Sequence, residues 1–417
     1  MKITKRLCLN LILPVCFAVV GVILLYAVSL IPQSAIFPQF RQSALQLSRK
    51  SDYVFDNERM AYIMDYNTDA SILIESYTLR ADEPENVLLN PILMPGTVLQ
   101  SDAMLAMCDG EAPNVNYVRY WMGFRLLFRP LLLAFAYDSI GWLLSLAFFT
   151  LLVLTLAKIG GRLGTRTAAC FGLALVLVNP AVAAHSPQFF CCFALSFLMM
   201  LYLLRDGRRL PISTCFVCFG ILTQFFDFYT TPVMTLGLPL LLCLEQKLFA
   251  GKRIRGVLSS LVAWLYGYVG MWLTKLVMTS IFTSEDGLYD GLMSLLGRLE
   301  MLPEQGGAAY HAPDALRTVW ATVFPGKLLW PTLAVFLAML LYVVAAYFKT
   351  PEKEERELIG AELLTAAIPL VWFSVAAQPT CIHAWFQYRG ICVSFCSLFL
   401  CLSRAVGLQK RRRGAAR

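Results

Sequence analysis

Runs of about twenty apolar residues recur along this chain of 417 residues, and they constrain its fold more than any other feature. A helix of that length crosses a hydrocarbon layer of roughly 30 Å and satisfies its own backbone hydrogen bonds there. Hydrophobic residues make up 58% of the chain and charged residues only 15%, which excludes an ordinary soluble domain. The sequence predicts an all-α, polytopic membrane protein with a single membrane-embedded domain over residues 1–417.

Ten of these runs are predicted to span the membrane. Their approximate bounds are 8–31, 138–158, 167–184, 187–204, 210–227, 231–248, 257–282, 328–348, 358–377 and 389–407. The first run follows a basic start and superficially resembles a signal peptide. It is long, however, and no small-x-small cleavage pattern follows it, so we expect a retained first helix.

Basic residues are distributed unequally between the two sides of the predicted membrane domain. Ten spans place both termini on one side, and the segments on that side carry 22 of the 35 lysines and arginines but 7 of the 27 acidic residues. Short loops rich in Lys and Arg mark the cytoplasm, so both termini are predicted to be cytoplasmic in a plasma (inner) membrane. The net charge of +8 therefore reports orientation and does not indicate a nucleic-acid partner.

Two longer segments, 32–137 and 283–327, are predicted to be extracytoplasmic. Both contain apolar residues at helical spacing, so we expect helices that fold against the membrane surface. The first segment contains the stretch Tyr53–Glu75, which concentrates acidic residues in an otherwise apolar chain. These are Asp56, Glu58, Asp65, Asp69 and Glu75.

Two carboxylates of this stretch, Asp65 and Asp69, lie four residues apart and share one face if the segment is helical. One interpretation is catalytic: a carboxylate at the membrane surface would take the proton of an attacking hydroxyl as a general base. The other is structural, because Asn67 and Thr68 suit a helix start and the helix dipole favours an aspartate in the first turn. Spacing alone does not separate them.

Cations with aromatic neighbours follow at Arg119–Leu133, where Arg125 and Arg129 are one turn apart. The guanidinium fork suits phosphate oxygens, so these arginines are candidates to bind a lipid-linked phosphate. Trp121 beside them is a candidate to orient an acceptor. The alternative is a helix that lies in the membrane interface with its cations toward the headgroups.

Two more charged residues are predicted near the outer ends of spans, where a charge is costly and usually has a purpose. Asp227 either orients a ligand or caps the next helix at Thr230–Pro232, where proline suits a first turn. Lys275 either faces a phosphate or extends its side chain toward the interface.

The last polar cluster, Gln378–Arg389, is predicted at a short outer turn. There His383, Gln387 and Arg389 could together hold a phosphate or polarise a leaving oxygen. A tight loop with a belt of aromatic residues is the structural alternative.

Cysteine and histidine patterns do not indicate a zinc site. Most of the 13 cysteines lie inside apolar runs and are expected to pack as small hydrophobic residues. Cys108 and Cys381 lie outside these runs, which leaves a bridge between them open. No His/Cys cluster suits zinc, so any metal would be Mg²⁺ or Mn²⁺ with oxygen ligands.

Four motifs resemble, in their order and predicted side, bacterial membrane proteins of the GT-C glycosyltransferase superfamily, in particular the GtrII-like group and related multi-pass transferases. The motifs are Asp65-Tyr66-Asn67-Thr68-Asp69-Ala70, Tyr120-Trp121-Met122-Gly123 with Arg129-Pro130-Leu131-Leu132, Phe226-Asp227-Phe228-Tyr229-Thr230-Thr231-Pro232, and His383-Ala384-Trp385-Phe386-Gln387-Tyr388-Arg389. One departure is Met122, where the similar proteins tend to have histidine. This departure weakens any role of that helix in phosphate binding.

The resemblance implies a transferase that inverts the anomeric carbon of a sugar taken from a polyprenyl-phosphate donor at the outer membrane face. The acceptor would be a glycan or lipid of the cell envelope. By position, Asp69 matches the essential loop carboxylate best and Asp65 comes next. The candidate phosphate contacts are Arg125, Arg129, Lys275, His383, Gln387 and Arg389. In some similar proteins a divalent metal assists.

The competing interpretation is a transporter or flippase of a lipid-linked saccharide. Such proteins are expected to carry broken helices or polar groups near the middle of the membrane, often in two matching halves. Here the polar residues gather at the predicted outer ends of the spans, which favours a site at the outer surface.

Overall fold

The computed structural model describes residues 2–50, 60–94, 99–227, 229–249, 251–298 and 310–415. Over these residues the chain is helical almost throughout, which confirms the predicted helical class. The described exception is one antiparallel pair of short strands, β1 (Pro91–Ile92) and β2 (Val115–Asn116), with Pro91 opposite Asn116.

Six helical stretches in the described chain are long and apolar enough to cross a membrane. They are Asn10–Ser29 in α1 (Lys2–Ser29), α7 (Tyr137–Leu163), α13 (Arg253–Phe282), Gly326–Lys349 in η2 (Gly326–Leu328) and α16 (Leu329–Lys349), α17 (Lys353–Val375), and Ala384–Gln409, which ends in α20 (Cys392–Ala415). The chain thus has the helices of a multi-pass membrane protein.

The other four predicted spans correspond to shorter apolar helices, so the predicted count of ten is not reached by helix length. They are α8 (Thr165–Val176), α10 (Pro187–Leu203), α11 (Ile212–Phe226) and α12 (Val233–Glu245). The predicted span 167–184 is interrupted because Asn179 adopts a left-handed conformation with φ 51°, and α9 (Pro180–His185) follows it. At 1.5 Å per residue, the 17 residues of α10 rise about 25 Å, less than the hydrocarbon core.

Three of these short helices, α10, α11 and α12, form the interior of the bundle. Every residue of α12 from Val233 to Leu244 is buried, as expected for a helix that is apolar on all sides. α11 and α13 cross closely at two glycines, because a Cβ at Gly220 or Gly267 would overlap the backbone of the other helix. Small residues at such a crossing allow van der Waals contact between backbones, which is a principal source of helix association in lipid.

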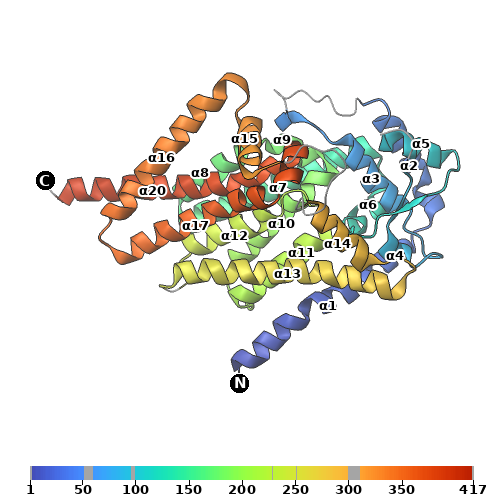
Figure 1. Cartoon of the computed structure of the whole chain (residues 1–417), viewed down its shortest axis with the longest axis horizontal. Coiled ribbons are helices and arrows are strands. Elements are labelled where there is room, and N and C mark those ends of the chain that lie inside the picture. The colour runs from blue at the N-terminus through green and yellow to red at the C-terminus, as the bar shows by residue number, and fades with distance from the viewer. Residues whose placement is uncertain are drawn as a thin grey trace.

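The segment predicted as the first long loop forms a layer of short helices at the end of the molecule opposite the C-terminus (Figure 1). Its elements are α2 (Gln33–Leu47), η1 (Met60–Tyr62), α3 (Tyr66–Tyr77), α4 (Asn86–Leu89), α5 (Gln100–Cys108) and α6 (Arg125–Leu131). The acidic residues Asp56 and Glu58 lie outside the described residues. We refer to these elements as the helical layer.

The second long loop is also helical where it is described, with α14 (Gly287–Arg298) and α15 (Ala312–Val323). The predicted apolar repeat at Leu288, Leu292 and Leu295 lies within α14. Between α17 and α20 the chain forms α18 (Ala377–Ile382), α19 (Ala384–Gln387) and η3 (Tyr388–Ile391). This irregular link packs against α15 and η1 and forms one wall of the main cavity.

Candidate functional site

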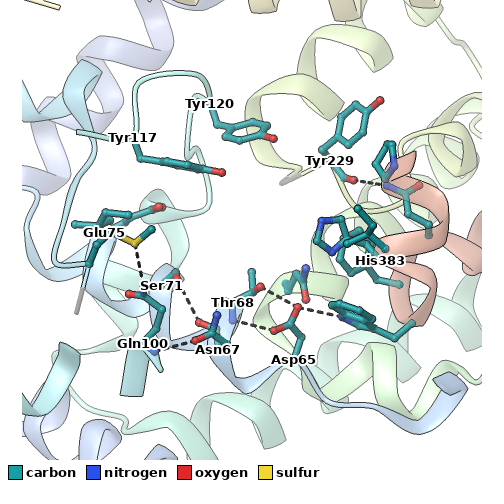
Figure 2. A pocket seen from close by; sticks show the side chains of 18 of the residues that line it. Asp65, Asn67, Thr68, Ser71, Glu75, Gln100, Tyr117, Tyr120, Tyr229 and His383 are labelled. Carbon is teal, nitrogen blue, oxygen red and sulfur yellow. Dashed lines mark hydrogen bonds between the residues drawn. The ribbon is translucent and has the colours of Figure 1, made fainter. Parts of the chain in front are cut away.

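A cavity of about 410 Å³ lies between the helical layer and the link from α17 to α20. Its lining is rich in amide, hydroxyl and aromatic side chains, with two carboxylates and one histidine, as Figure 2 shows. The polar and aromatic members are Asp65, Asn67, Thr68, Ser71, Glu75, Gln100, Tyr117, Tyr120, Gln188, Tyr229, Gln378, His383, Trp385, Phe386 and Gln387. Such a lining suits a ligand with many hydroxyl groups and an apolar face.

Asp65 connects the two walls of this cavity. It is the N-cap of α3: one carboxylate oxygen accepts the backbone N–H of Thr68 at 3.0 Å, and the other accepts the Thr68 hydroxyl at 2.8 Å. The second oxygen also accepts the indole N–H of Trp385 at 3.1 Å, across 320 positions of sequence. Asp65 therefore has the structural role of a helix cap that one interpretation of this motif expected, and the same carboxylate also lines the cavity.

The facing wall comes from α18 and α19, as Figure 2 shows for His383. The imidazole of His383 stacks on Phe386 with ring centroids 5.2 Å apart and an interplanar angle of 16°. Gln387 is held by its side-chain N–H, which donates to the carbonyl of Tyr229 at 3.0 Å. The link thus places His383 and Gln387, both predicted from the sequence, at the cavity.

Asp69, the carboxylate favoured by the resemblance, is fully buried and is not among the cavity-lining residues. It accepts hydrogen bonds from the hydroxyls of Tyr137 at 2.7 Å and Ser186 at 2.9 Å, and from the backbone N–H of Gln188 at 3.0 Å. These partners belong to α7 and to the start of α10, so Asp69 joins the helical layer to the bundle. Burial raises the pKa of Asp69 to about 7, against the lowering effect of its hydrogen bonds.

We expect this raised pKa to make stability depend on pH. Between about pH 4 and pH 7 the folded state holds a proton on Asp69 that the unfolded state has lost, so the free energy of unfolding falls as pH rises. The slope from one such group is at most ~1.4 kcal/mol per pH unit. Thermal unfolding in detergent at pH 5, 6 and 7 measures it, and Asp69→Asn should flatten the curve. An unchanged slope in this variant would assign the dependence to another group.

Arg125 and Arg129 do not reach the cavity: both are fully buried and their donors are occupied by backbone carbonyls. Arg125 donates hydrogen bonds to the carbonyls of Asn86 at 3.0 Å and Val87 at 2.8 Å. Arg129 donates to three carbonyls, those of Val28 at 3.0 Å, Ser76 at 2.7 Å and Ile31 at 2.5 Å. Burial lowers the pKa of each to about 10, so both remain cations at neutral pH. Both side chains are enclosed by protein, and their hydrogen bonds hold segments of the helical layer in place.

Lys275 and Trp121 form a buried contact behind the same layer. The ammonium of Lys275 donates to the carbonyl of Leu88 and lies 5.6 Å from the centroid of the Trp121 indole ring. The indole N–H donates to Met271 O at 2.8 Å. Lys275 is fully buried, which excludes the predicted extension of its side chain toward the interface.

The remaining predicted residues, Arg389 and Asp227, lie in the interior beside the cavity. Arg389 donates to Trp385 O at 2.5 Å and stacks on the ring of Phe189, 4.3 Å from its centroid. Asp227 accepts the backbone N–H of Thr230 at 3.0 Å and also its hydroxyl. Asp227 therefore caps the turn before α12, as one sequence interpretation expected.

Glu75 and the tyrosines 117, 120 and 229 line the cavity but were not predicted as site residues. A signal for part of this set was present. Thr68, Ser71 and Glu75 repeat at spacings of three and four, which places polar groups on one face of α3, while Ile72 and Leu73 are buried. Tyr117 and Tyr120 come from the segment before α6 and Tyr229 from the turn before α12, so no local pattern links all three.

The sequence leaves open a metal with oxygen ligands and a bridge between Cys108 and Cys381. Among the described residues, no three His, Cys, Asp or Glu side chains gather as a metal-binding set. The carboxylate ligands expected for Mg²⁺ or Mn²⁺ are thus not assembled in that part of the chain. Cys108 and Cys381 are not bridged to each other, and the Cys381 sulfur accepts a weak hydrogen bond from the Thr318 hydroxyl at 3.9 Å.

Comparisons with other proteins add nothing to this geometry. No family model, curated protein or solved structure matches the chain.

Proposed function

We propose that the protein is an integral membrane glycosyltransferase of the GT-C type, which takes a sugar from a polyprenyl-phosphate donor and transfers it to a glycan or lipid acceptor. The observation that carries this proposal is the cavity between the helical layer and the α17–α20 link. It combines an anchored carboxylate, Asp65, with amides, tyrosines and the indole of Trp385. Aromatic faces and amide groups are the usual partners of sugar rings and hydroxyls.

The proposed topology has ten membrane passages, with both termini in the cytoplasm of a bacterial cell and the helical layer outside. The excess of Lys and Arg on the terminal side supports this orientation. In the structure the helical layer lies at the end opposite the C-terminus, as Figure 1 shows. Of the four helices shorter than a full span, α10, α11 and α12 lie inside the bundle, where neighbouring helices rather than lipid surround much of their length.

A second, apolar groove supports a lipid-linked donor. It has a volume of about 680 Å³ and lies between α15, α16, α17 and α20, with residues such as Trp320, Phe336 and Leu370 in its walls. Of the described residues of α16, only Val343 is buried, so this helix presents most of its apolar surface outward. One charged residue, Arg317, lines the groove. An isoprenoid chain in the groove, with its phosphate near Arg317, matches this distribution.

The α17–α20 link contributes residues to both the cavity and the groove. Ile391 in η3 lines the groove, while Gln387 and His383, a few residues earlier, line the cavity. None of the described cavity residues is Lys or Arg, whereas Arg317 lines the groove, so we assign the sugar to the cavity and the phosphate to the groove. His383 is the cavity group best suited to donate a hydrogen bond to the departing oxygen.

The reaction follows from this placement. Asp65 accepts the proton of the acceptor hydroxyl while the hydroxyl oxygen forms a bond to the anomeric carbon. The bond between that carbon and the phosphate oxygen breaks, and its electron pair leaves with the polyprenyl phosphate. The products are the glycoside, with inverted configuration, and the free lipid phosphate. The wall around Asp65 holds its carboxylate in one orientation through Thr68 and Trp385, which favours catalysis by positioning.

The test is a donor-dependence assay on purified protein in lipid vesicles. Undecaprenyl phosphate carrying glucose, galactose, mannose or N-acetylglucosamine is supplied with a cell-envelope extract as acceptor, and released undecaprenyl phosphate is measured. We expect release with at least one sugar, at least tenfold above empty vesicles. No release with any of the four would contradict the proposal.

Transport of a lipid-linked saccharide is a second candidate, favoured by one observation. Arg404 in α20 bridges the carboxylates of Glu245 in α12 and Glu362 in α17, the latter at 3.1 Å, and Glu362 is fully buried. Ionisable groups between spanning helices often serve transport. The same vesicles distinguish the candidates, because a transporter would move the intact donor across the bilayer without releasing lipid phosphate.

A further inference from the structure

Glu75 is a buried carboxylate that lines the cavity and has no hydrogen-bond partner for its side chain among the described residues. Its side chain is on the same face of α3 as Thr68 and Ser71, and the residue is only 1% exposed. Neither carboxylate oxygen accepts a hydrogen bond. Figure 2 places Glu75 on the side of the cavity away from His383 and Asp65. Buried polar groups are nearly always hydrogen-bonded, so this carboxylate needs an explanation.

Two basic side chains lie close enough to lower the pKa of Glu75, but neither donates a hydrogen bond to its carboxylate. Arg125 and Lys275 both favour its ionised form through space. Their N–H groups, however, donate to the backbone carbonyls of Asn86, Val87 and Leu88. The structure therefore supplies positive charge close to Glu75 and leaves both of its oxygens without a hydrogen-bond donor, in a residue that lines the cavity.

Without a ligand, this arrangement is unfavourable for the ionised carboxylate. Burial raises the pKa of Glu75 to about 8, and Arg125 and then Lys275 oppose the increase. A ligand that donates hydrogen bonds to both oxygens would replace the lost hydration and lower the pKa again. The group is thus suited to bind a donor-rich ligand rather than to stabilise the empty fold.

We propose that Glu75 is a specificity-determining residue of the cavity, whose two oxygens accept hydrogen bonds from a pair of hydroxyl groups on the sugar. The proposal rests on the proposed function, since it takes the ligand to be a saccharide. Neighbouring groups agree with it: Ser71, Gln100 and Tyr117 line the same part of the cavity and can bond further hydroxyls.

Neutral hydroxyls fit this carboxylate better than a cation does. Arg125 already provides a positive charge close to Glu75, so an ammonium group or a metal ion in the same part of the cavity would be repelled by it. A phosphate or carboxylate ligand would in turn face the negative charge of Glu75 at short range. A pair of adjacent hydroxyls carries no charge and matches the spacing of two carboxylate oxygens.

The experiment measures saccharide binding separately from turnover. The full-length protein in nanodiscs is titrated with methyl glycosides of glucose, galactose, mannose and N-acetylglucosamine, and binding is followed by saturation-transfer NMR. We expect wild type to bind at least one glycoside, Glu75→Gln to bind it at least tenfold more weakly, and Glu75→Ala more weakly still. Wild-type affinity should rise up to tenfold per pH unit from pH 6 toward pH 8, and Glu75→Gln should lose this dependence.

Glu85→Gln is the matched control, because Glu85 is an exposed carboxylate of the same layer outside the cavity. We expect the Glu85→Gln variant to bind the glycoside with the same affinity as wild type. Equal binding by Glu75→Gln, no binding by wild type, or binding that EDTA abolishes would each overturn the proposal. Glycoside binding that depends on Glu75 without lipid-phosphate release would support this site while rejecting the transferase. If Glu75→Gln turned over the donor with unchanged KM and sugar preference, the transferase would be supported and the role of Glu75 rejected.

Discussion

Asp65→Asn is expected to lower kcat for donor-dependent transfer by about 10²- to 10⁴-fold, because the amide cannot accept the proton of the attacking hydroxyl. The fold should survive the change. Asparagine caps helices as well as aspartate does, so it can still accept the backbone N–H of Thr68. The measurement is release of undecaprenyl phosphate from reconstituted vesicles, with the donor KM determined in parallel. A loss confined to kcat would identify a role in the chemical step.

Asp69→Asn is the informative comparison, since the sequence resemblance favours Asp69 as the essential carboxylate while the geometry favours Asp65. Asp69 is fully buried behind the cavity and accepts three hydrogen bonds. We therefore expect the Asp69 variant to change the melting temperature more than kcat. The opposite ranking, with activity lost at Asp69 and retained at Asp65, would refute the assignment of the base.

Arg129→Ala should destabilise the protein by roughly 4 kcal/mol, because it leaves several buried carbonyls without a donor at ~1–3 kcal/mol each. The guanidinium connects Val28 O and Ile31 O, at the end of α1, with Ser76 O and Tyr77 O, at the end of α3. A cation at two helix C-termini is also favourable to both helix dipoles. The expected result in detergent is an apparent melting temperature several degrees lower and a reduced yield of folded protein.

Arg119→Ala is the control for this change. Arg119 is partly exposed and pairs with Asp290 at 3.3 Å on α14, so its removal should cost at most ~1 kcal/mol. If Arg129→Ala were as stable as Arg119→Ala but lost donor binding, the phosphate-binding role predicted from the sequence would be supported over the structural one.

Local features of the sequence were sufficient for the helical architecture. Apolar length identified the six long helices, and helical spacing identified α14, because both are properties of neighbouring residues. The same reasoning overestimated the length of the helices in four predicted spans, α8, α10, α11 and α12. A hydrophobic run does not report where a helix stops, and the left-handed turn at Asn179 interrupts one run.

The roles of charged residues were harder to predict from the sequence, because their hydrogen-bond partners lie far away along the chain. Arg125 and Arg129 resembled phosphate ligands only while the backbone carbonyls opposite them were unknown. His383 and Gln387 were placed correctly at a polar turn, and the fold brings that turn to the helical layer. Glu75 carried no motif of its own, and its unpartnered oxygens appear only when the walls around it are assembled.

The carboxylates of Tyr53–Glu75 illustrate the division between the two kinds of information. By itself the sequence determined that this chain is a membrane-embedded helical protein and that its carboxylates gather in one segment before the second long run, because composition and period are local properties. Only the tertiary structure decided that Asp65 and Glu75 line the cavity while Asp69 is enclosed behind it. The reason is that cavity access depends on contacts such as that between Asp65 and Trp385, which join residues 320 positions apart.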